Sequence, residues 1–400
     1  MNQITLPNSR SRIYSLDILR GIVMIIMALD HTRDFFHFDA FVHDPLDLAT
    51  TSPWLFFTRW VTHFCAPAFV FLAGTSAFLQ SGKKSKKELS LFLIKRGLWL
   101  IFIEVTVITF AWSFDVGYHL LALQVIWAIG FSMVMLGLLI WLPLTAIFII
   151  GAAITLGHDL LDNTVIMQSK DSGALFDLLF KGNFAHYQYA PGHSAMMIYA
   201  GIPWLGVMML GYCFGTIYQS DFGEKRRRRL LNIMGLGLLL LFVSLRSFNI
   251  YGDPHHWSGE KNVLFSFLSF INLTKYPPSL LYLCITIGPA LLFLANFENV
   301  NNKFTQAVSV FGRVPFFYYV LHLYLLHGIE VVTYFWRGHS FAEGVASNGK
   351  NVFLFSKPGE GFPLWGVYVV WILVVLALYP LCKWFNDYKN RHRVWWMSYL

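Results

Sequence analysis

The chain has 400 residues, of which 56% are hydrophobic, 18% aromatic and only 13% charged, and its formal net charge is +8. Soluble globular domains carry about 25% charged residues, so this composition excludes a disordered chain, a collagen, a coiled coil and an ordinary soluble enzyme. The apolar runs are long and unbroken, whereas the strands of an outer-membrane barrel alternate over ~10 residues. The sequence therefore predicts an all-α polytopic membrane protein.

Ten hydrophobic segments approach or exceed the ~20 residues that a helix needs to cross a bilayer. They are residues 15–36, 53–80, 92–114, 120–141, 143–158, 196–218, 230–247, 279–297, 309–335 and 363–385. A shorter apolar stretch, 262–274, predicts an interfacial or re-entrant helix. The polar start of the chain shows no signal-cleavage pattern, and no internal repeat is visible. We therefore expect one bundle domain over residues 15–385, flanked by cytoplasmic tails 1–14 and 386–400.

The distribution of Lys and Arg predicts the orientation of these spans. Basic residues gather in both tails and after every second span, as in KKSKK at 83–87 and KRRRR at 225–229. Cytoplasmic loops carry such an excess, so both termini are predicted to be cytoplasmic and the histidine-rich loops extracytoplasmic. The four cysteines lie in apolar runs without CxxC spacing, so we interpret them as packing residues and expect no metal site.

The first predicted span carries ionisable residues near both of its ends. Arg20 lies near the inner end, and Asp30, His31 and Asp34 lie near the outer end. Such residues are costly inside a bilayer and usually mark function. A carboxylate beside an imidazole fixes its tautomer and raises its basicity, which suits a general base. The alternative is a polar cluster that caps the helix and faces water.

The second and ninth spans also carry histidines at membrane depth. Arg59 and His63 are four residues apart and share one helix face, with His63 ~15 Å below the outer end of its span. We therefore expect His31 and His63 to line one cavity. The alternative for His63 is a buried imidazole that is hydrogen-bonded to a neighbouring helix. In the ninth span, His322 and His327 are candidate cavity residues, and the surrounding aromatic residues are interpreted as core.

Several segments together resemble a known family. Similarity to the bacterial branch of the heparan-α-glucosaminide N-acetyltransferase family is carried by RIYSLDILRGIVMIIMALDH, APAFVFLAGTS, IPWLGVMMLGY, TKYPPSLLYL and GRVPFFYYVLHLYLLH. The spacing from Arg20 to His31 is also similar to the R-x10-H signature of the wider transmembrane acyltransferase superfamily, which includes the acyltransferase-3 proteins. The resemblance implies about ten helices that move an acyl group from cytosolic acyl-CoA to an extracytoplasmic acceptor. The resemblance to that signature implies that the arginine helps to bind CoA and that the histidine takes part in the chemistry.

This chain departs from the lysosomal members of that family at the candidate site. Those members have Asn at the position equivalent to His31. They carry their catalytic histidine in the following loop, where this chain has His37 and His43. They also have Asp where this chain has His63. Neither the catalytic histidine nor the acceptor is therefore carried over from them.

The resulting hypothesis is a membrane-embedded acyltransferase with separate binding regions for its two substrates. Acyl-CoA, in the first place acetyl-CoA, is expected to bind near Arg20, Lys95 and Arg96 on the inner side. The acceptor, an extracytoplasmic sugar amine or hydroxyl, is expected to meet a set of polar side chains on the outer side. This set comprises Arg59, Lys275, His322 and His327.

Four residues are expected to carry the chemistry. His31, oriented by Asp30 or Asp34, would deprotonate the acceptor for attack on the thioester. An acyl-histidine intermediate is compatible with this scheme but not required by it. His63, or the neighbouring Arg59, would stabilise the oxyanion.

The main alternative is a transporter of a small anionic or sugar metabolite that uses the same His, Arg and Asp residues as a relay. A signalling or scaffold protein would leave the membrane-depth histidines unexplained. Expected partners are membrane lipid and a glycan or small-molecule acceptor, not nucleic acid, and a homodimer is compatible with the sequence. The expected location is the bacterial inner membrane.

Overall fold

The computed structural model describes residues 13–169, 172–346, 353–392 and 394, so most of the predicted tails lies outside the described residues. A helical unit stands at each of the ten predicted segments. The helices concerned are α1 (Tyr14–Phe36), α2 (Pro53–Val61), α3 (Cys65–Ser81), α4 (Lys86–Ile103), α5 (Thr109–Ser113), α6 (Val125–Leu139), α7 (Leu144–Gly157), α10 (Gly201–Phe214), α11 (Glu224–Phe248), α13 (Leu280–Asn296), α14 (Lys303–Arg313), α15 (Pro315–Trp336) and α17 (Leu364–Arg391). The last of these continues beyond the predicted domain end at residue 385.

Several of these units are composite. A 3₁₀ turn (Thr62–Phe64) joins α2 to α3, and a π-helical turn (Glu104–Ile108) joins α4 to α5. The ninth predicted segment is divided, because α14 ends at Arg313 and α15 begins at Pro315, where a proline suits the first position of a helix. The remaining short helices are α8 (Val165–Gln168), α9 (Ala174–Phe176), α12 (Val263–Ile271) and α16 (Phe341–Ala346). The helix predicted within 262–274 is confirmed as α12.

Within the described residues, six helical units are long and apolar enough to cross a membrane. They are Pro53–Ser81, Leu144–Leu161, Gly201–Tyr218, Glu224–Phe248, Pro315–Trp336 and Leu364–Arg391. Two further apolar helices, Val125–Leu139 and Leu280–Asn296, are shorter. The structure thus agrees with a predominantly helical membrane protein, while the count of ten spans and their orientation remain predictions.

A small sheet was not predicted from the sequence. It comprises β1 (Leu120–Leu123), β2 (Ala185–Ala190) and β3 (His193–Met197) in the order β1-β3-β2. β3 pairs parallel with β1 and antiparallel with β2. The segments starting at residues 120 and 196 therefore begin as strands, which hydropathy does not separate from helix ends because both are short and apolar.

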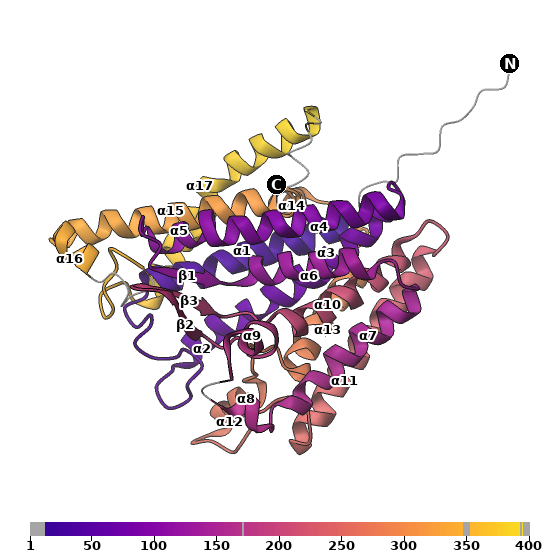
Figure 1. The fold of residues 1–400 in the computed structure, drawn as a ribbon, viewed down its shortest axis with the longest axis horizontal. Coiled ribbons are helices and arrows are strands. Elements are labelled where there is room, and N and C mark those ends of the chain that lie inside the picture. Colours follow the sequence, from indigo (N-terminus) through magenta and orange to yellow (C-terminus); the bar gives the residue numbers. More distant parts are fainter. Residues whose placement is uncertain (1–12, 170–171, 347–352, 393, 395–400) are drawn as a thin grey trace.

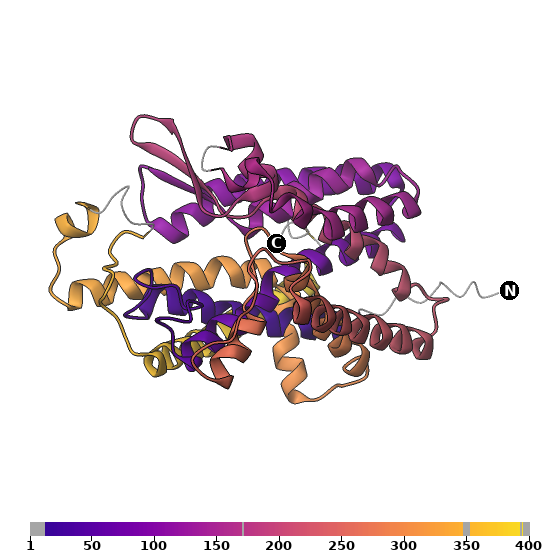
Figure 2. The same ribbon diagram turned by 90° about the horizontal axis from the view of Figure 1, so that it is seen from below.

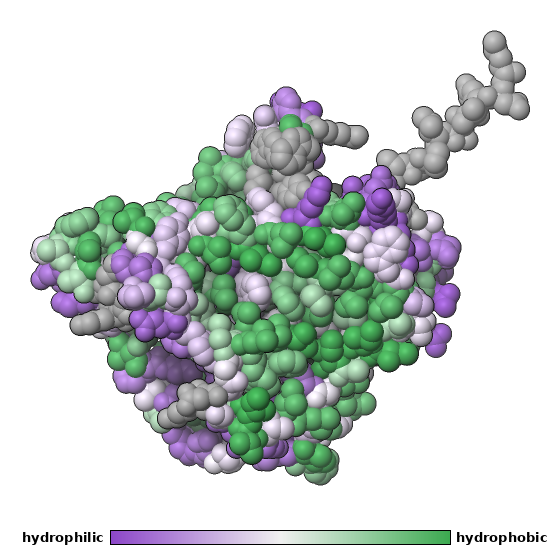
Figure 3. Space-filling model, in the orientation of Figure 1, coloured by the Kyte–Doolittle hydropathy of each residue, from purple (hydrophilic) through white to green (hydrophobic). Residues whose placement is uncertain are grey.

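The sheet, α16 and the loop after α1 lie together at one end of the molecule, at the left in Figures 1 and 2, and the first described residues lie toward the other end. Hydrophobic side chains cover much of the helical surface between these ends, and hydrophilic ones gather toward the ends (Figure 3). This distribution suits a protein whose helices are surrounded by lipid.

The crossing of α1 and α14 depends on two glycines. A Cβ atom at Gly21 would lie 2.1 Å from the carbonyl oxygen of Val308, and one at Gly312 would lie 1.9 Å from that of Asp17. The two backbones therefore touch directly, as small residues allow in membrane helices. This contact fixes α1, which carries several candidate site residues, against the helix that leads into α15.

Candidate active site

Two cavities lie among the helices and share part of their walls. The larger, about 800 Å³, is lined by His31 and His63 and is here named the histidine cavity. The smaller, about 280 Å³, is lined by Arg20 and Arg96 and is named the arginine cavity. Both are lined by the same four residues, which we name the collar: Met27, Phe69, Val125 and Tyr319. These come from α1, α3, α6 and α15, one from each helix.

Helix α1 passes along both cavities. Arg20 lines the arginine cavity, Met27 belongs to the collar, and Asp30 and His31 line the histidine cavity. Eleven residues of helix correspond to ~16 Å and about three turns, so Arg20 and His31 lie on nearly the same face. The spacing singled out in the sequence thus places an arginine and a histidine on opposite sides of the collar.

The His31 ring is held by a second histidine. His31 Nδ1 lies 2.7 Å from His322 Nε2, and His322 Nδ1 lies 3.0 Å from the carbonyl oxygen of Tyr318. A carbonyl only accepts, so His322 Nδ1 carries a hydrogen, and Nε2 of the neutral ring then accepts from His31 Nδ1–H. No other hydrogen bond of the His31 ring is found among the described residues. This arrangement leaves the lone pair on His31 Nε2, as a general base requires.

Asp30 and Asp34 do not orient His31 as expected. Arg33 lies 3.1 Å from Asp30 and 2.5 Å from Asp34, and Arg59 lies 3.1 Å from the other oxygen of Asp30. Arg59 also donates to the hydroxyl of Thr62 at 2.8 Å. Buried charges are retained when they are paired, and these arginines supply the pairing. Asp30 therefore joins α1 to α2 through Arg59, Asp34 pairs with Arg33 within α1, and His322 takes the orienting position.

His63 lies in the wall of the histidine cavity with only 1% of its surface exposed. The hydroxyl of Tyr282 donates to the backbone carbonyl of His63 at 2.8 Å, so this hydrogen bond does not involve the imidazole nitrogens of His63. The Nε2 atom of His63 is buried and has no hydrogen-bond partner among the described residues. Buried polar atoms are usually satisfied, so this nitrogen is available to a ligand in the cavity.

Lys275 also lines the histidine cavity, in the loop between α12 and α13. Its ammonium group lies 5.1 Å from the ring centre of Tyr276 and 5.8 Å from that of Tyr199. Burial alone would raise the pKa of Tyr276, but the charges of Lys275 and Arg59 outweigh it and lower that pKa below its usual value. Cationic and aromatic groups therefore lie side by side in this wall.

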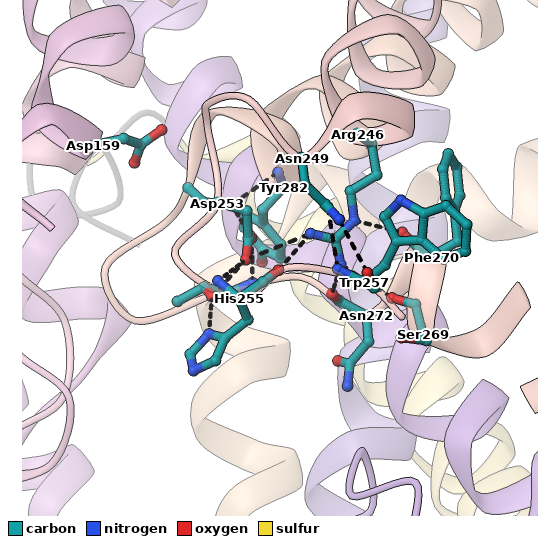
Figure 4. A network of polar contacts seen from close by, with 12 residues as sticks. Asp159, Arg246, Asn249, Asp253, His255, Trp257, Ser269, Phe270, Asn272 and Tyr282 are labelled. Carbon is teal, nitrogen blue, oxygen red and sulfur yellow. Dashed lines mark hydrogen bonds and ion pairs between the residues drawn. The ribbon is translucent and has the colours of Figure 1, made fainter. Parts of the chain in front are cut away.

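A polar network, shown in Figure 4, holds the loop that carries Lys275. Arg246, at the end of α11, donates to four backbone carbonyls, those of His255, Ser269, Phe270 and Asn272. Asp253 accepts from the backbone of Thr274 at 2.8 Å and from the hydroxyl of Ser279 at 2.7 Å. Sequence reasoning missed this network, because its acceptors are mostly backbone atoms.

Three predicted site residues, His322, His327 and Lys95, line neither cavity, and His322 lies behind His31 as its hydrogen-bond partner. The ring nitrogens of His327 lie 2.9 Å from the carbonyl oxygens of Ala111 and Leu354, so this histidine joins α5 to the segment after residue 352 and does not line the histidine cavity. Lys95 is exposed and does not line the arginine cavity, whereas the next residue, Arg96, does. A helix turns by 100° per residue, which here directs Lys95 and Arg96 to different sides of α4.

The arginine cavity has more cationic lining than the sequence predicted. Arg313 and Lys389 line it together with Arg20 and Arg96. Arg20 donates to the hydroxyl of Ser76 on α3 at 2.5 Å, and both Arg20 and Arg313 lie within 4 Å of Asp17. Arg313 and Lys389 come from distant parts of the chain, so no local pattern joins them to Arg20.

A family model described as heparan-alpha-glucosaminide N-acetyltransferase, catalytic, matches residues 12–253, more than half of the chain. The chain belongs to the heparan-alpha-glucosaminide N-acetyltransferase family. The predicted resemblance is thereby confirmed, and membership indicates a membrane acetyltransferase of this type. Arg20, His31 and His63 lie inside the matched region, whereas Tyr319 and His322 lie beyond it. The comparison with curated proteins finds no match to the chain.

Proposed function

We propose that the protein transfers an acetyl group from cytosolic acetyl-CoA to a sugar amine or hydroxyl on the extracytoplasmic side of a bacterial inner membrane. The observation that carries this proposal is the pair of cavities that meet at the collar. An arginine-lined hollow and a histidine-lined hollow on opposite sides of one constriction suit a donor and an acceptor that enter from different sides.

The arginine cavity is proposed to receive acyl-CoA. Its four cationic residues, Arg20, Arg96, Arg313 and Lys389, suit the phosphates, because charge-assisted contacts to phosphate are strong. A phosphorylated nucleotide cannot cross the hydrocarbon region, whereas the slender pantetheine arm can extend along α1. The thioester would then lie at the collar, beside His31.

His31 Nε2 is proposed to take the proton of the acceptor as its oxygen or nitrogen attacks the thioester carbon. The C–S bond then breaks, and the proton passes from His31 to the departing sulfur, which leaves as the CoA thiol. His63, Arg59 and Lys275 line the same cavity and are proposed to hold the acceptor. In this scheme Asp30 keeps Arg59 in place.

The test uses purified protein in vesicles with radiolabelled acetyl-CoA on the cytoplasmic face and two acceptor probes on the other. Glucosamine offers an amine and hydroxyls, and methyl glucoside offers hydroxyls only. We expect label on at least one probe, and loss of transfer when Val125→Phe fills the collar. Val243→Phe is the matched control, because Val243 is 49% exposed on α11. Probe flux without any label on either probe would instead support the transporter.

A further inference from the structure

Two buried hydrogen-bond donors beside His31 have no acceptor of ordinary geometry in the part of the chain that the structure describes. Trp112 on α5 and Tyr319 on α15 are 4% and 3% exposed. The indole Nε1 of Trp112 and the hydroxyl of Tyr319 lie close to each other, and neither forms a hydrogen bond of ordinary geometry among the described residues. Folded proteins rarely leave buried donors unpaired, since their lost hydration is then uncompensated. Unpaired donors in a cavity wall therefore point to an acceptor atom on a ligand.

Both donors lie at the point where the two cavities meet. The ring centre of His31 is 4.8 Å from that of Trp112 and 6.1 Å from that of Tyr319. Trp112 lines the histidine cavity, and Tyr319 lines both cavities as part of the collar. A thioester reaching the collar from the arginine cavity would lie next to both side chains.

Trp112 is fixed by its neighbours. Its ring is stacked on Phe35 at 5.5 Å and on Phe353 at 5.3 Å. A donor that is already held in place stabilises developing charge without the cost of reorganisation. Packing of this kind supplies the rigidity that an oxyanion site needs.

Arg59, the cation first considered as a stabiliser of the oxyanion, already has partners. Arg59 is paired with Asp30 and donates to Thr62, which leaves it engaged on the α1–α2 side of the histidine cavity. Trp112 and Tyr319, in contrast, flank the ring of the proposed base. The atom attacked must lie about 3–3.5 Å from the nucleophile that His31 activates, so its oxygen needs donors close to that ring.

We infer that the indole N–H of Trp112 and the phenol O–H of Tyr319 form the oxyanion site for the thioester carbonyl, an inference that rests on the proposed acyl transfer. Attack of the acceptor oxygen or nitrogen on the carbonyl carbon places a negative charge on the carbonyl oxygen. Both donors hydrogen-bond to this oxygen while the acceptor proton moves to His31 Nε2. Collapse of the tetrahedral intermediate re-forms the carbonyl and breaks the C–S bond.

The test compares Trp112→Phe and Tyr319→Phe with the wild type in the vesicle assay. Each variant removes one donor and keeps an aromatic ring in place. Loss of a single oxyanion donor lowers kcat by roughly 10²- to 10³-fold, with little change in KM when the interaction belongs to the transition state. We expect this result for both variants. The assignment is overturned if either retains kcat within about threefold of the wild type.

Matched controls separate this chemistry from the loss of any buried donor. Trp204 and Tyr218 also carry buried donors that form no hydrogen bond of ordinary geometry among the described residues, with Tyr218 lying near Ser15, and they line neither cavity. Trp204→Phe and Tyr218→Phe are expected to keep kcat near the wild-type value. A comparable loss of kcat in these controls would argue against the assignment. A wild type that transfers no acetyl group would refute the proposed function itself, which distinguishes the two failures.

A spectroscopic readout covers the case in which a variant folds poorly or turns over too slowly. His31→Ala is expected to bind carbonyl-13C-labelled acetyl-CoA without turnover, and hydrogen bonds at the carbonyl lower the frequency of its stretch. Adding Tyr319→Phe to this background should raise the frequency, and so should Trp112→Phe. A frequency that stays the same in both double variants would overturn the inference.

Discussion

His322 on α15 lies 2.7 Å from His31 on α1, nitrogen to nitrogen, although 291 positions separate them in the chain. Because His322 also faces the carbonyl of Tyr318, its single available lone pair determines which nitrogen of His31 carries the hydrogen. A histidine, rather than a carboxylate, therefore orients the proposed base.

This pair predicts different losses for its two members. His31→Ala should lower kcat by roughly 10²- to 10⁴-fold, the range for loss of a general base. His322→Ala should have a smaller effect, because His31 remains but loses the partner that fixes its tautomer. Initial rates in vesicles measure both effects, and the pH–rate profile of His322→Ala should shift. Equal losses of kcat in both variants, with an unchanged pH–rate profile, would indicate that the two histidines contribute only to packing.

The arginine cavity predicts a difference between two neighbouring cations. Arg96→Ala should raise the KM for acetyl-CoA by roughly tenfold, in line with loss of one charge-assisted contact, and should leave the KM for the acceptor unchanged. Lys95→Ala should change neither, because the Lys95 side chain is exposed outside the cavity. Steady-state kinetics with each substrate varied in turn would check this. If Lys95→Ala gave the larger effect, the cavity would not be the donor site.

The α1–α14 crossing predicts a sharp cost for one added side chain. Gly312→Val should destabilise the protein by about 2 kcal/mol or more, because its Cβ meets the backbone of Asp17 and neither helix can yield cheaply. Gly237→Val is the control, since no atom of the described residues lies within 4 Å of a Cβ at that position on α11. Thermal unfolding in detergent should show a lower midpoint for Gly312→Val alone. Similar midpoints for both variants would contradict the close crossing.

Asp162, in the loop after Leu161, predicts a dependence of stability on pH. Burial, followed by the charge of Asp159, raises the pKa of Asp162 to about 7. The folded state then holds this proton more tightly than the unfolded state, so stability falls as the pH rises from about 4 to 7. Asp162→Asn should remove this part of the loss, as melting temperatures between pH 5 and 8 would show. Identical pH profiles for the variant and the wild type would rule out this contribution.

Hydropathy predicted the helical units well, since each depends on a local run of apolar residues. It missed the break between Arg313 and Pro315, because a proline at the start of one helix lies inside a continuous apolar run. It also missed the sheet, because β1 and β3 are about 70 residues apart and each is too short to show a period of its own.

The candidate site was predictable where single residues are unusual for their segment. Arg20, His31 and His63 were found because ionisable residues stand out in apolar segments. Trp112 and Tyr319 did not stand out, since aromatic residues in such segments usually form core. The orienting role of His322 was missed for another reason, because pairing between α1 and α15 leaves no trace in local spacing.

The collar takes one residue from each of four helices. The separation between the two hollows therefore depends on the rotamers of four individual side chains. Trimming one of them, as in Met27→Ala, would reduce this separation without altering any helix axis. Under the proposed acyl transfer, single substitutions here are expected to change which acyl chains the protein accepts.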